Sequence, residues 1–125
     1  ENVKVEARAF EDGKFVDYET KMYTVPLLSE KPKYSLFMGG DHQFAKMHTQ
    51  NTNGKTLLVI KDSYANALLP LLTEDYETIL VIDPRNYYGK VTDLISEYNV
   101  DDCLFINYVF TTTFSDFVGK LNEVK

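Results

Sequence analysis

One serine stands where a strongly apolar segment gives way to a polar one. The apolar run Leu57 to Ile60 is followed directly by Lys61, Asp62 and Ser63. If the run is a buried strand and a helix begins after it, the Ser63 hydroxyl lies on a sharp turn where backbone N–H groups can stabilise an oxyanion. This position suits a nucleophile. The structural alternative is that Asp62 or Ser63 only caps the helix by accepting a backbone hydrogen bond.

A nucleophilic serine also needs a base and groups that stabilise negative charge. The base must have a pKa near neutral, and the sequence offers only His42 and His48. His42 is the alternative base that we consider, against the simpler interpretation of a solvated loop histidine. Asn107 could donate its amide to an oxyanion, and Arg85 could hold an anionic group with its planar fork. Their structural alternatives are a residue that ends a strand and a cation paired with a neighbouring carboxylate.

Metal and cofactor chemistry find little support in the sequence. The spacing of Asp41, His42 and His48 matches no closed zinc site or facial triad, so no metal site is predicted. No strand is followed by a glycine-rich phosphate-binding loop, and we expect no nucleotide or other cofactor. The single cysteine, Cys103, lies in an apolar run and is predicted to be a buried, inert thiol.

A repeated pattern of apolar runs and helical segments would position these residues. The runs are Leu57 to Ile60, Ile79 to Ile82 and Cys103 to Ile106, and the helical segments span 64–74, 90–98 and 113–124. Continuous rather than alternating apolar character is typical of parallel strands covered on both faces. We therefore expect a three-layer α/β/α fold with a mostly parallel sheet. Loops after parallel strands share one edge, which would gather residues 39–42, 61–63, 83–88 and 107–108, with Gly40, Ser63, Arg85, Asn107 and Tyr108 among them.

The N-terminal part has a different pattern. Residues 3–23 alternate between apolar and polar around an Asp12-Gly13 turn, which predicts a β-hairpin. Pro26 and Pro32 then indicate a linker. We therefore divide the chain into a hairpin with its linker, residues 1–32, and an α/β domain, residues 33–125. Within that domain, residues 34–38 are predicted to form a strand, followed by a loop or short helix as far as the turn at Gly54.

Composition excludes several partners. With 125 residues, 44% of them hydrophobic, the chain can form one modest core but is short for a complete α/β enzyme. Its formal net charge of −6, with no Lys/Arg cluster, disfavours nucleic acid and anionic membrane surfaces. Its apolar runs fall well short of the roughly 20 residues that a membrane-spanning helix needs.

Two segments carry a family resemblance. Residues 57–66, which read Leu-Leu-Val-Ile-Lys-Asp-Ser-Tyr-Ala-Asn, and residues 81–88 closely resemble the C-terminal part of bacterial DHHW-family proteins. The resemblance covers about residues 34–114, and the family is similar to SGNH hydrolases and alginate O-acetyltransferase-like proteins. It implies an SGNH-hydrolase-like, or flavodoxin-like, partial domain with an N-terminal hairpin. Ser63 would be the nucleophile and its amide an oxyanion donor.

The resemblance also implies a function and a missing part. Arg85 and Asn107 are similar in placement to an arginine of the acetyltransferase-like relatives and to an oxyanion-hole asparagine, with Gly40 and Tyr108 beside them. The Asp-His-His-Trp motif that should supply the base is absent, and the chain has no tryptophan. Either this chain is the C-terminal part of a longer enzyme that supplies the histidine and aspartate elsewhere, or the lineage has lost its base.

Two functions follow from this resemblance. The first is a serine-dependent acyl-ester hydrolase or O-acetyltransferase that acts on cell-envelope polysaccharide or acyl-sugar, outside the cytoplasm, and is inactive as this fragment. The second is a non-catalytic module of the bacterial envelope that binds glycan or scaffolds envelope proteins. Its contacts would be Arg85, Tyr87, Tyr88 and Tyr108.

Overall fold

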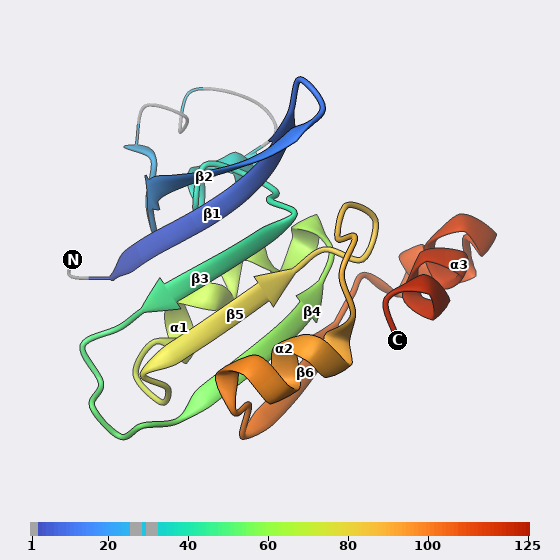
Figure 1. Cartoon of the computed structure of the whole chain (residues 1–125). Coiled ribbons are helices and arrows are strands. Elements are labelled where there is room, and N and C mark those ends of the chain that lie inside the picture. The colour runs from blue at the N-terminus through green and yellow to red at the C-terminus, as the bar shows by residue number, and fades with distance from the viewer. Residues whose placement is uncertain (1–2, 26–28, 30–32) are drawn as a thin grey trace.

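A computed structural model describes residues 3–25, 29 and 33–125 of the chain. Within them, six strands form one sheet in the order β2-β1-β3-β5-β4-β6 (Figure 1). The strands are β1 (Lys4–Glu11), β2 (Lys14–Lys21), β3 (Phe44–His48), β4 (Thr56–Lys61), β5 (Thr78–Ile82) and β6 (Asp102–Ile106). The helices are α1 (Leu69–Leu72), α2 (Val91–Tyr98) and α3 (Ser115–Glu123), with 3-10 turns η2 (Lys33–Leu36), η3 (Ser63–Ala67) and η4 (Val109–Thr113).

The sheet is mixed, and the expected three-layer α/β/α fold with a mostly parallel sheet is wrong. Strand β4 pairs in parallel with β5 and β6. The other three pairings, β1 with β2, β1 with β3 and β3 with β5, are antiparallel. The described part of the chain is therefore mostly β structure with few helices, and its parallel region is confined to three strands.

Strand β3 is the element that sequence reasoning missed. Its segment was expected to be a loop or short helix, but its side chains alternate across the sheet, with Ala45 and Met47 buried and Lys46 turned outward. The strand predicted at residues 34–38 is instead the η2 turn, with only an isolated bridge between Tyr23 and Phe37. Because β3 lies between β1 and β5, it joins the hairpin to the parallel strands in one sheet.

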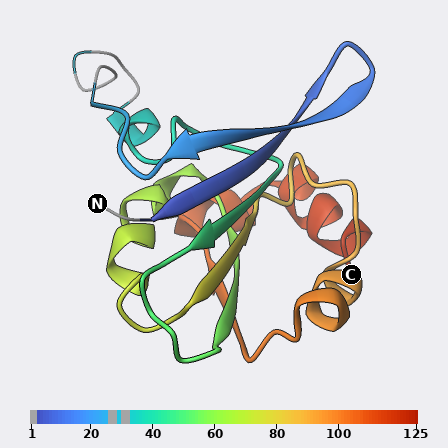
Figure 2. The same ribbon diagram turned by 60° about the vertical axis from the view of Figure 1, so that its left-hand side comes forward.

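The hairpin itself closes in two residues. Glu11 pairs with Lys14, and Asp12 and Gly13 between them both have positive φ, at 47° and 78°. This backbone suits the twist of the flanking strands, and it explains why Asp-Gly predicts a hairpin. Figure 2 shows the hairpin tip projecting away from the rest of the sheet.

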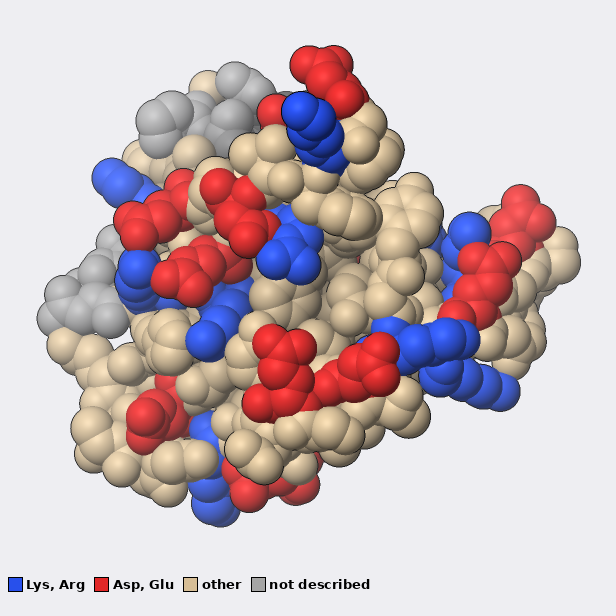
Figure 3. Space-filling view, in the orientation of Figure 1, with Lys and Arg blue, Asp and Glu red and all other residues tan. Residues whose placement is uncertain are grey.

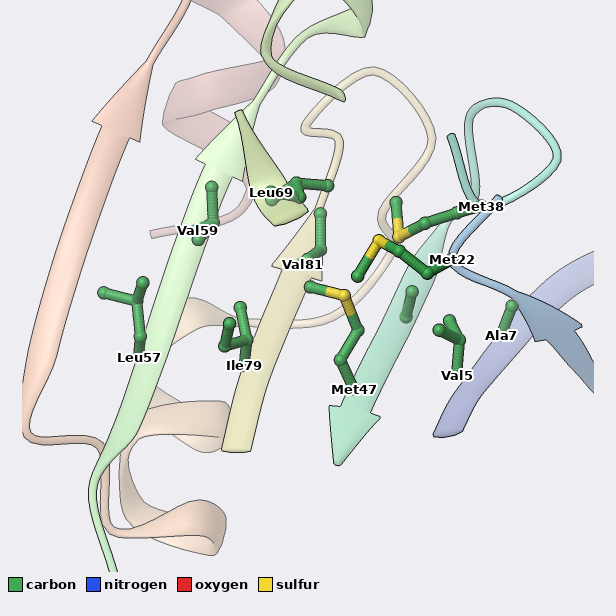
Figure 4. Packing of buried hydrophobic residues seen from close by; sticks show 11 residues of the cluster. Val5, Ala7, Met22, Met38, Met47, Leu57, Val59, Leu69, Ile79 and Val81 are labelled. Atoms are coloured by element: carbon green, nitrogen blue, oxygen red, sulfur yellow. The ribbon is translucent and has the colours of Figure 1, made fainter. Parts of the chain in front are cut away.

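The core lies on both faces of the sheet, but only the central strands β4 and β5 are buried on both faces, whereas the edge strand β6 is largely exposed. On one face, Leu57, Val59 and Met47 pack with Leu69 of α1 (Figure 4). On the other, Leu58 and Leu80 pack with Leu94 of α2. That second face carries charged side chains on the antiparallel strands, namely Glu6, Arg8 and Lys46. Figure 3 shows acidic and basic side chains interspersed over the molecule on the side of β1 to β3 and α2.

Charged side chains explain why the second layer of helices stops where it does. Burying Glu6, Arg8 and Lys46 under a helix would remove their charges from water without adequate compensation. The antiparallel half of the sheet therefore faces solvent on this side, as antiparallel sheets commonly do.

The helical segments agree only in part with the sequence-based prediction, and Cys103 does not agree with it. Helices α2 and α3 lie within the predicted segments 90–98 and 113–124, whereas residues 64–74 form only the η3 turn and the four-residue α1. The expectation that Cys103 is buried is wrong, because its side chain is exposed on the edge strand β6. Pro26 and Pro32 of the expected linker lie outside the described residues, so the division at residue 33 stays a prediction. No described helix has the length and apolar character needed to cross a membrane.

Replacing Leu80 with alanine tests the second core. Leu80 is fully buried on β5, so Leu80→Ala should lower the free energy of unfolding by about 2–5 kcal/mol. The same change at Leu71, which is 69% exposed, should cost at most about 0.5 kcal/mol. Urea unfolding followed by far-UV circular dichroism measures both. Equal losses in the two variants would contradict this description of the core.

Candidate active site

The topology brings three segments to one edge of the sheet. Strands β4 and β5 are parallel, so the residues after them, Ser63 and Arg85, emerge on the same side. Strand β3 runs antiparallel to β5, with Phe44 paired to Ile82, so the start of β3 lies at that edge as well. Asp41 stands just before β3 and is thereby brought to Ser63.

The Ser63 hydroxyl lies between a carboxylate and a guanidinium group. Its Oγ donates a hydrogen bond to Oδ2 of Asp41. Nη2 of Arg85 donates to the same Oγ over 3.1 Å. The hydroxyl is therefore held in place by an acceptor and a donor of opposite charge, and both come from loops far from it in sequence.

Asp41 is held as a carboxylate by a buried lysine. Lys61 Nζ lies 2.9 Å from Oδ1 of Asp41, and the Lys61 side chain is only 1% exposed. Asn66 Nδ2 donates to the same oxygen over 3.1 Å. Partial burial raises the pKa of Asp41, but the Lys61 charge and the hydrogen bonds from Ser63, Lys61 and Asn66 outweigh it and hold the pKa below its ordinary value. Asp41 is consequently ionised at neutral pH.

A second buried carboxylate orients the arginine. Asp83 is fully buried at the end of β5 and accepts hydrogen bonds from Arg85 Nε, over 2.9 Å to Oδ1, and from Arg85 Nη2. The hydrogen bonds that Arg85 donates to Asp83 also raise the pKa of Arg85 above its already high ordinary value. This paired geometry fixes the guanidinium plane, so that Nη2 reaches Ser63.

Asp62 performs the capping role that the sequence left open between Asp62 and Ser63. Its Oδ1 accepts from the Tyr64 amide over 3.0 Å, which caps the η3 turn. Its Oδ2 accepts from the Tyr108 amide over 2.8 Å and from Thr111 Oγ1 over 2.7 Å. Asp62 therefore fastens the loop after β6 to the end of β4 and leaves the Ser63 hydroxyl free of capping. Tyr108 stacks on Tyr64 with ring centroids 4.5 Å apart.

Gly40 and Asn107, two further residues predicted for the site, make no hydrogen bond to Ser63 among those described. The Gly40 amide donates to Phe37 O over 3.0 Å, and the Gly40 carbonyl accepts from Asn66, so this amide is already used within its loop. Asn107 follows β6, and its buried side-chain nitrogen and oxygen have no hydrogen-bond partner among the described residues. An amide with its polar atoms unsatisfied is unusual in a folded protein and retains its capacity to donate.

His42 is committed to other partners. Its Nε2 lies 2.7 Å from the Met38 carbonyl and its Nδ1 lies 2.6 Å from the Tyr18 hydroxyl. A carbonyl only accepts, so we assign the proton to Nε2, and Nδ1 then accepts from Tyr18. Burial lowers the pKa of His42, which favours the neutral ring. His48 pairs with Thr78 at the other end of the strands, where β3 ends and β5 begins. No histidine hydrogen-bonds to Ser63 in the described part of the structure.

Sequence reasoning missed the polar residues beneath the serine. Asp41, Lys61 and Asp83 belong to the loops predicted to share one edge of the sheet, but the sequence assigns none of them a catalytic role. The residues described here contain no metal-binding group of three or more His, Cys, Asp or Glu side chains. Lys61, Asn66 and Asp83 are buried. A charged residue at the end of a continuous apolar strand, as Lys61 is, was the available signal, because buried charges need partners.

The fold and this arrangement define a serine-centred site at the carboxyl edge of a parallel strand pair. The chain belongs to the DHHW protein family, whose profile matches residues 5–82. A DHHW family protein from Eubacterium siraeum DSM 15702 is similar in structure, with a TM-score of 0.78 and 28% sequence identity. The match covers 98% of this chain and 40% of that one, so this chain spans less than half the length of its relative.

Two structures of Bacillus cereus PatB1 share the fold. One, with a sulfonyl adduct, has a TM-score of 0.70 at 23% identity, and the other has a TM-score of 0.68 at 24% identity. Each match covers 91% of this chain and 38% of PatB1. At these identities the likeness shows the fold alone. A comparison with curated protein sequences found no match.

Replacing Lys61 with methionine tests the buried ion pair. Lys61→Met removes the buried cation of Asp41 and leaves only the partly exposed Arg85 at 3.6 Å, so at pH 7 the free energy of unfolding should fall by about 3–5 kcal/mol. The pKa of Asp41 should rise, which a carboxyl-carbon NMR titration measures. Lys55→Met, at an exposed lysine, is the matched control and should change neither quantity appreciably.

The same pair predicts a pH dependence. Because the pKa of Asp41 is lowered in the folded state, Asp41 stabilises the fold above its ordinary pKa of 3.8, and this stabilisation is lost as the pH falls through the lowered value. The difference in stability between Lys61→Met and the unmodified chain should therefore shrink below about pH 3.8. A constant difference over the whole range would contradict the assignment.

Proposed function

We propose that Ser63 is the nucleophile of a serine-dependent acyl-ester hydrolase or O-acetyltransferase that acts on polysaccharide of the bacterial cell envelope. The observation that carries the proposal is the Ser63 hydroxyl itself. It lies at the carboxyl edge of the parallel strands, relieved of capping by Asp62 and held between Asp41 and Arg85. A purely structural serine would need none of this charged support.

The chemistry assigned to the site is acyl transfer through an ester of Ser63. A base takes the proton of the Ser63 hydroxyl as Oγ attacks the ester carbonyl carbon, and the carbonyl oxygen becomes an oxyanion. The Ser63 amide, Arg85 and the unsatisfied amide of Asn107 are the donors proposed for that oxyanion. When the tetrahedral intermediate collapses, the bond to the sugar oxygen breaks and that oxygen takes up a proton. Water then releases the acyl group in a hydrolase, and a second sugar hydroxyl accepts it in a transferase.

The described residues supply an orienting acceptor rather than an efficient base. Asp41 accepts from Ser63, but its lowered pKa makes it a weak proton acceptor. His42 is bound to Tyr18 and Met38. We therefore assign the base to a histidine outside this chain, in the Asp-His-His-Trp motif that the family resemblance places upstream. The greater length of the structurally similar proteins supports this assignment.

The sulfonyl adduct recorded for PatB1 offers a chemical route to a test. A sulfonyl group attaches covalently to a protein through a nucleophilic side chain. PatB1, which has the same fold, therefore reacts with such a reagent. The equivalent reaction of Ser63 would follow directly from its role as nucleophile.

The second candidate is a non-catalytic glycan-binding or scaffolding module of the cell envelope. It is favoured by one observation, namely that the described residues bring no histidine to Ser63. In that case Arg85, Tyr87, Tyr88 and Tyr108 would contact glycan. Location outside the cytoplasm and envelope protein partners belong to both candidates and are proposals in each.

Covalent labelling separates the two candidates. We expect a sulfonyl fluoride probe to add one equivalent to the chain when imidazole is supplied as an external base, since imidazole replaces the histidine that the site lacks. Ser63→Ala should abolish the adduct. Ser115→Ala, which removes another serine at the start of a helix, should leave it unchanged. Intact-mass spectrometry measures the adduct in all three proteins.

Two results would contradict the enzymatic proposal. One is the same degree of labelling in Ser63→Ala as in the unmodified chain. The other is an absence of labelling at Ser63 both with imidazole and in a form of the protein that includes the Asp-His-His-Trp motif. Either would favour the glycan-binding or scaffolding module.

A further inference from the structure

Three aromatic side chains form an exposed group beside the site. Phe10 and Phe15 face each other across the hairpin with ring centroids 5.1 Å apart. Tyr88, from the loop between β5 and α2, lies 6.2 Å from Phe10 and 6.4 Å from Phe15. The residues are 54%, 53% and 71% exposed, respectively. We call these three residues the aromatic shelf.

A groove extends from the shelf to Asp41, the hydrogen-bond partner of the serine. It encloses about 320 Å³, and Phe10 and Tyr88 line it together with Tyr18, Asp41, His42 and Asn86. Asp41, which lines the groove, accepts the hydrogen bond of the Ser63 hydroxyl. A molecule that lies on the shelf and extends along the groove would therefore contact the side chain that holds Ser63.

The groove offers few charges to a ligand. Arg8 at its wall is paired with Asp17 through two hydrogen bonds of 2.6 and 3.0 Å. Asp41 is paired with Lys61, and His42 is favoured in its neutral form. The cation lining the groove is thus already neutralised by a neighbour. A polyanion would find little to compensate its charge in a chain with a formal net charge of −6.

Exposed aromatic faces next to hydroxyl and amide groups match the chemistry of a neutral sugar. The C–H faces of a pyranose ring lie flat on aromatic rings, while its hydroxyl groups need donors and acceptors at the rim. Asn86 provides such a group, and the oxygen atoms of Tyr18 and Asp41 can accept further hydrogen bonds.

We propose that the aromatic shelf and its groove bind a neutral pyranose chain and direct it to Ser63. The proposal rests on the proposed function for its choice of a glycan over other ligands. It adds the subsite, with Tyr88 as a residue that binds the sugar, and it predicts that uncharged glycans are preferred.

A structural role for the shelf must be separated from binding. Paired aromatic residues across a hairpin stabilise it, so changes at Phe10 or Phe15 would disturb the fold as well as the shelf. Tyr88 lies outside the hairpin and is largely exposed, which makes it the better position to test. Phe114, which is 63% exposed and belongs neither to the shelf nor to the groove lining, is a matched aromatic control.

The test measures glycan binding in the Ser63→Ala chain, so that no reaction follows binding. Cellohexaose and chitohexaose serve as neutral probes, and hexamannuronate serves as the anionic one. Saturation-transfer NMR should show transfer from aromatic protons to the neutral sugars, and titration should give their affinities. Tyr88→Ala should weaken neutral-glycan binding about fivefold to tenfold, and Phe114→Ala should leave it unchanged.

Several outcomes would overturn the subsite. They are no binding of either neutral hexasaccharide, an affinity unchanged in Tyr88→Ala, and tighter binding of hexamannuronate than of the neutral probes. A dimer in sedimentation that Tyr88→Ala dissociates would show instead that the shelf contacts protein. Because Ser63 labelling needs no glycan and this binding needs no Ser63, labelling without binding refutes only the subsite. Binding without labelling refutes only the enzymatic proposal.

Discussion

The buried contact between Lys61 and Asp41 is the interaction on which the site depends. An ammonium group that is 1% exposed requires a compensating anion, and Asp41 provides it at 2.9 Å. This contact joins the end of β4 to the residues just before β3, two segments that are not neighbours in the sheet. The same carboxylate accepts from Ser63. The Asp41 carboxylate therefore both neutralises the buried lysine and positions the serine.

The contact between Lys61 and Asp41 also explains the direction of β3, and β3 in turn joins the hairpin to the sheet. Since β3 must run antiparallel to β5 for Asp41 to reach the carboxyl edge, its free side is available to pair with β1. Strand β1 then carries the hairpin tip toward the loop that follows β5, where Phe10 and Phe15 meet Tyr88. The antiparallel strands that overturned the three-layer expectation are thus the ones that place an aromatic surface beside the serine.

Sequence reasoning succeeded where one local signal decides the structure. The apolar runs that form β4 and β5 are determined by burial, and the Asp12-Gly13 turn is determined by backbone geometry. It failed at β3, which has five residues with alanine, lysine and methionine at its centre and so little intrinsic strand preference. Its pairing with β1 and β5 decides its conformation, and pairing is not visible in a single segment. The ends of the predicted strands place Ser63, Arg85 and Asp41 at one edge, but the contact between Asp41 and Ser63 depends on β3, which the sequence does not predict.

The charges around Ser63 also limit how its proton can leave. As the hydroxyl loses its proton, the negative charge on oxygen is opposed by the Asp41 carboxylate and favoured by the Arg85 guanidinium. Asp41 and Lys61 occupy the buried side of the hydroxyl, whereas the Arg85 side chain is 41% exposed. A proton acceptor must therefore approach from the open side, where Arg85 lies. An acceptor supplied by another segment could enter there without displacing the buried ion pair.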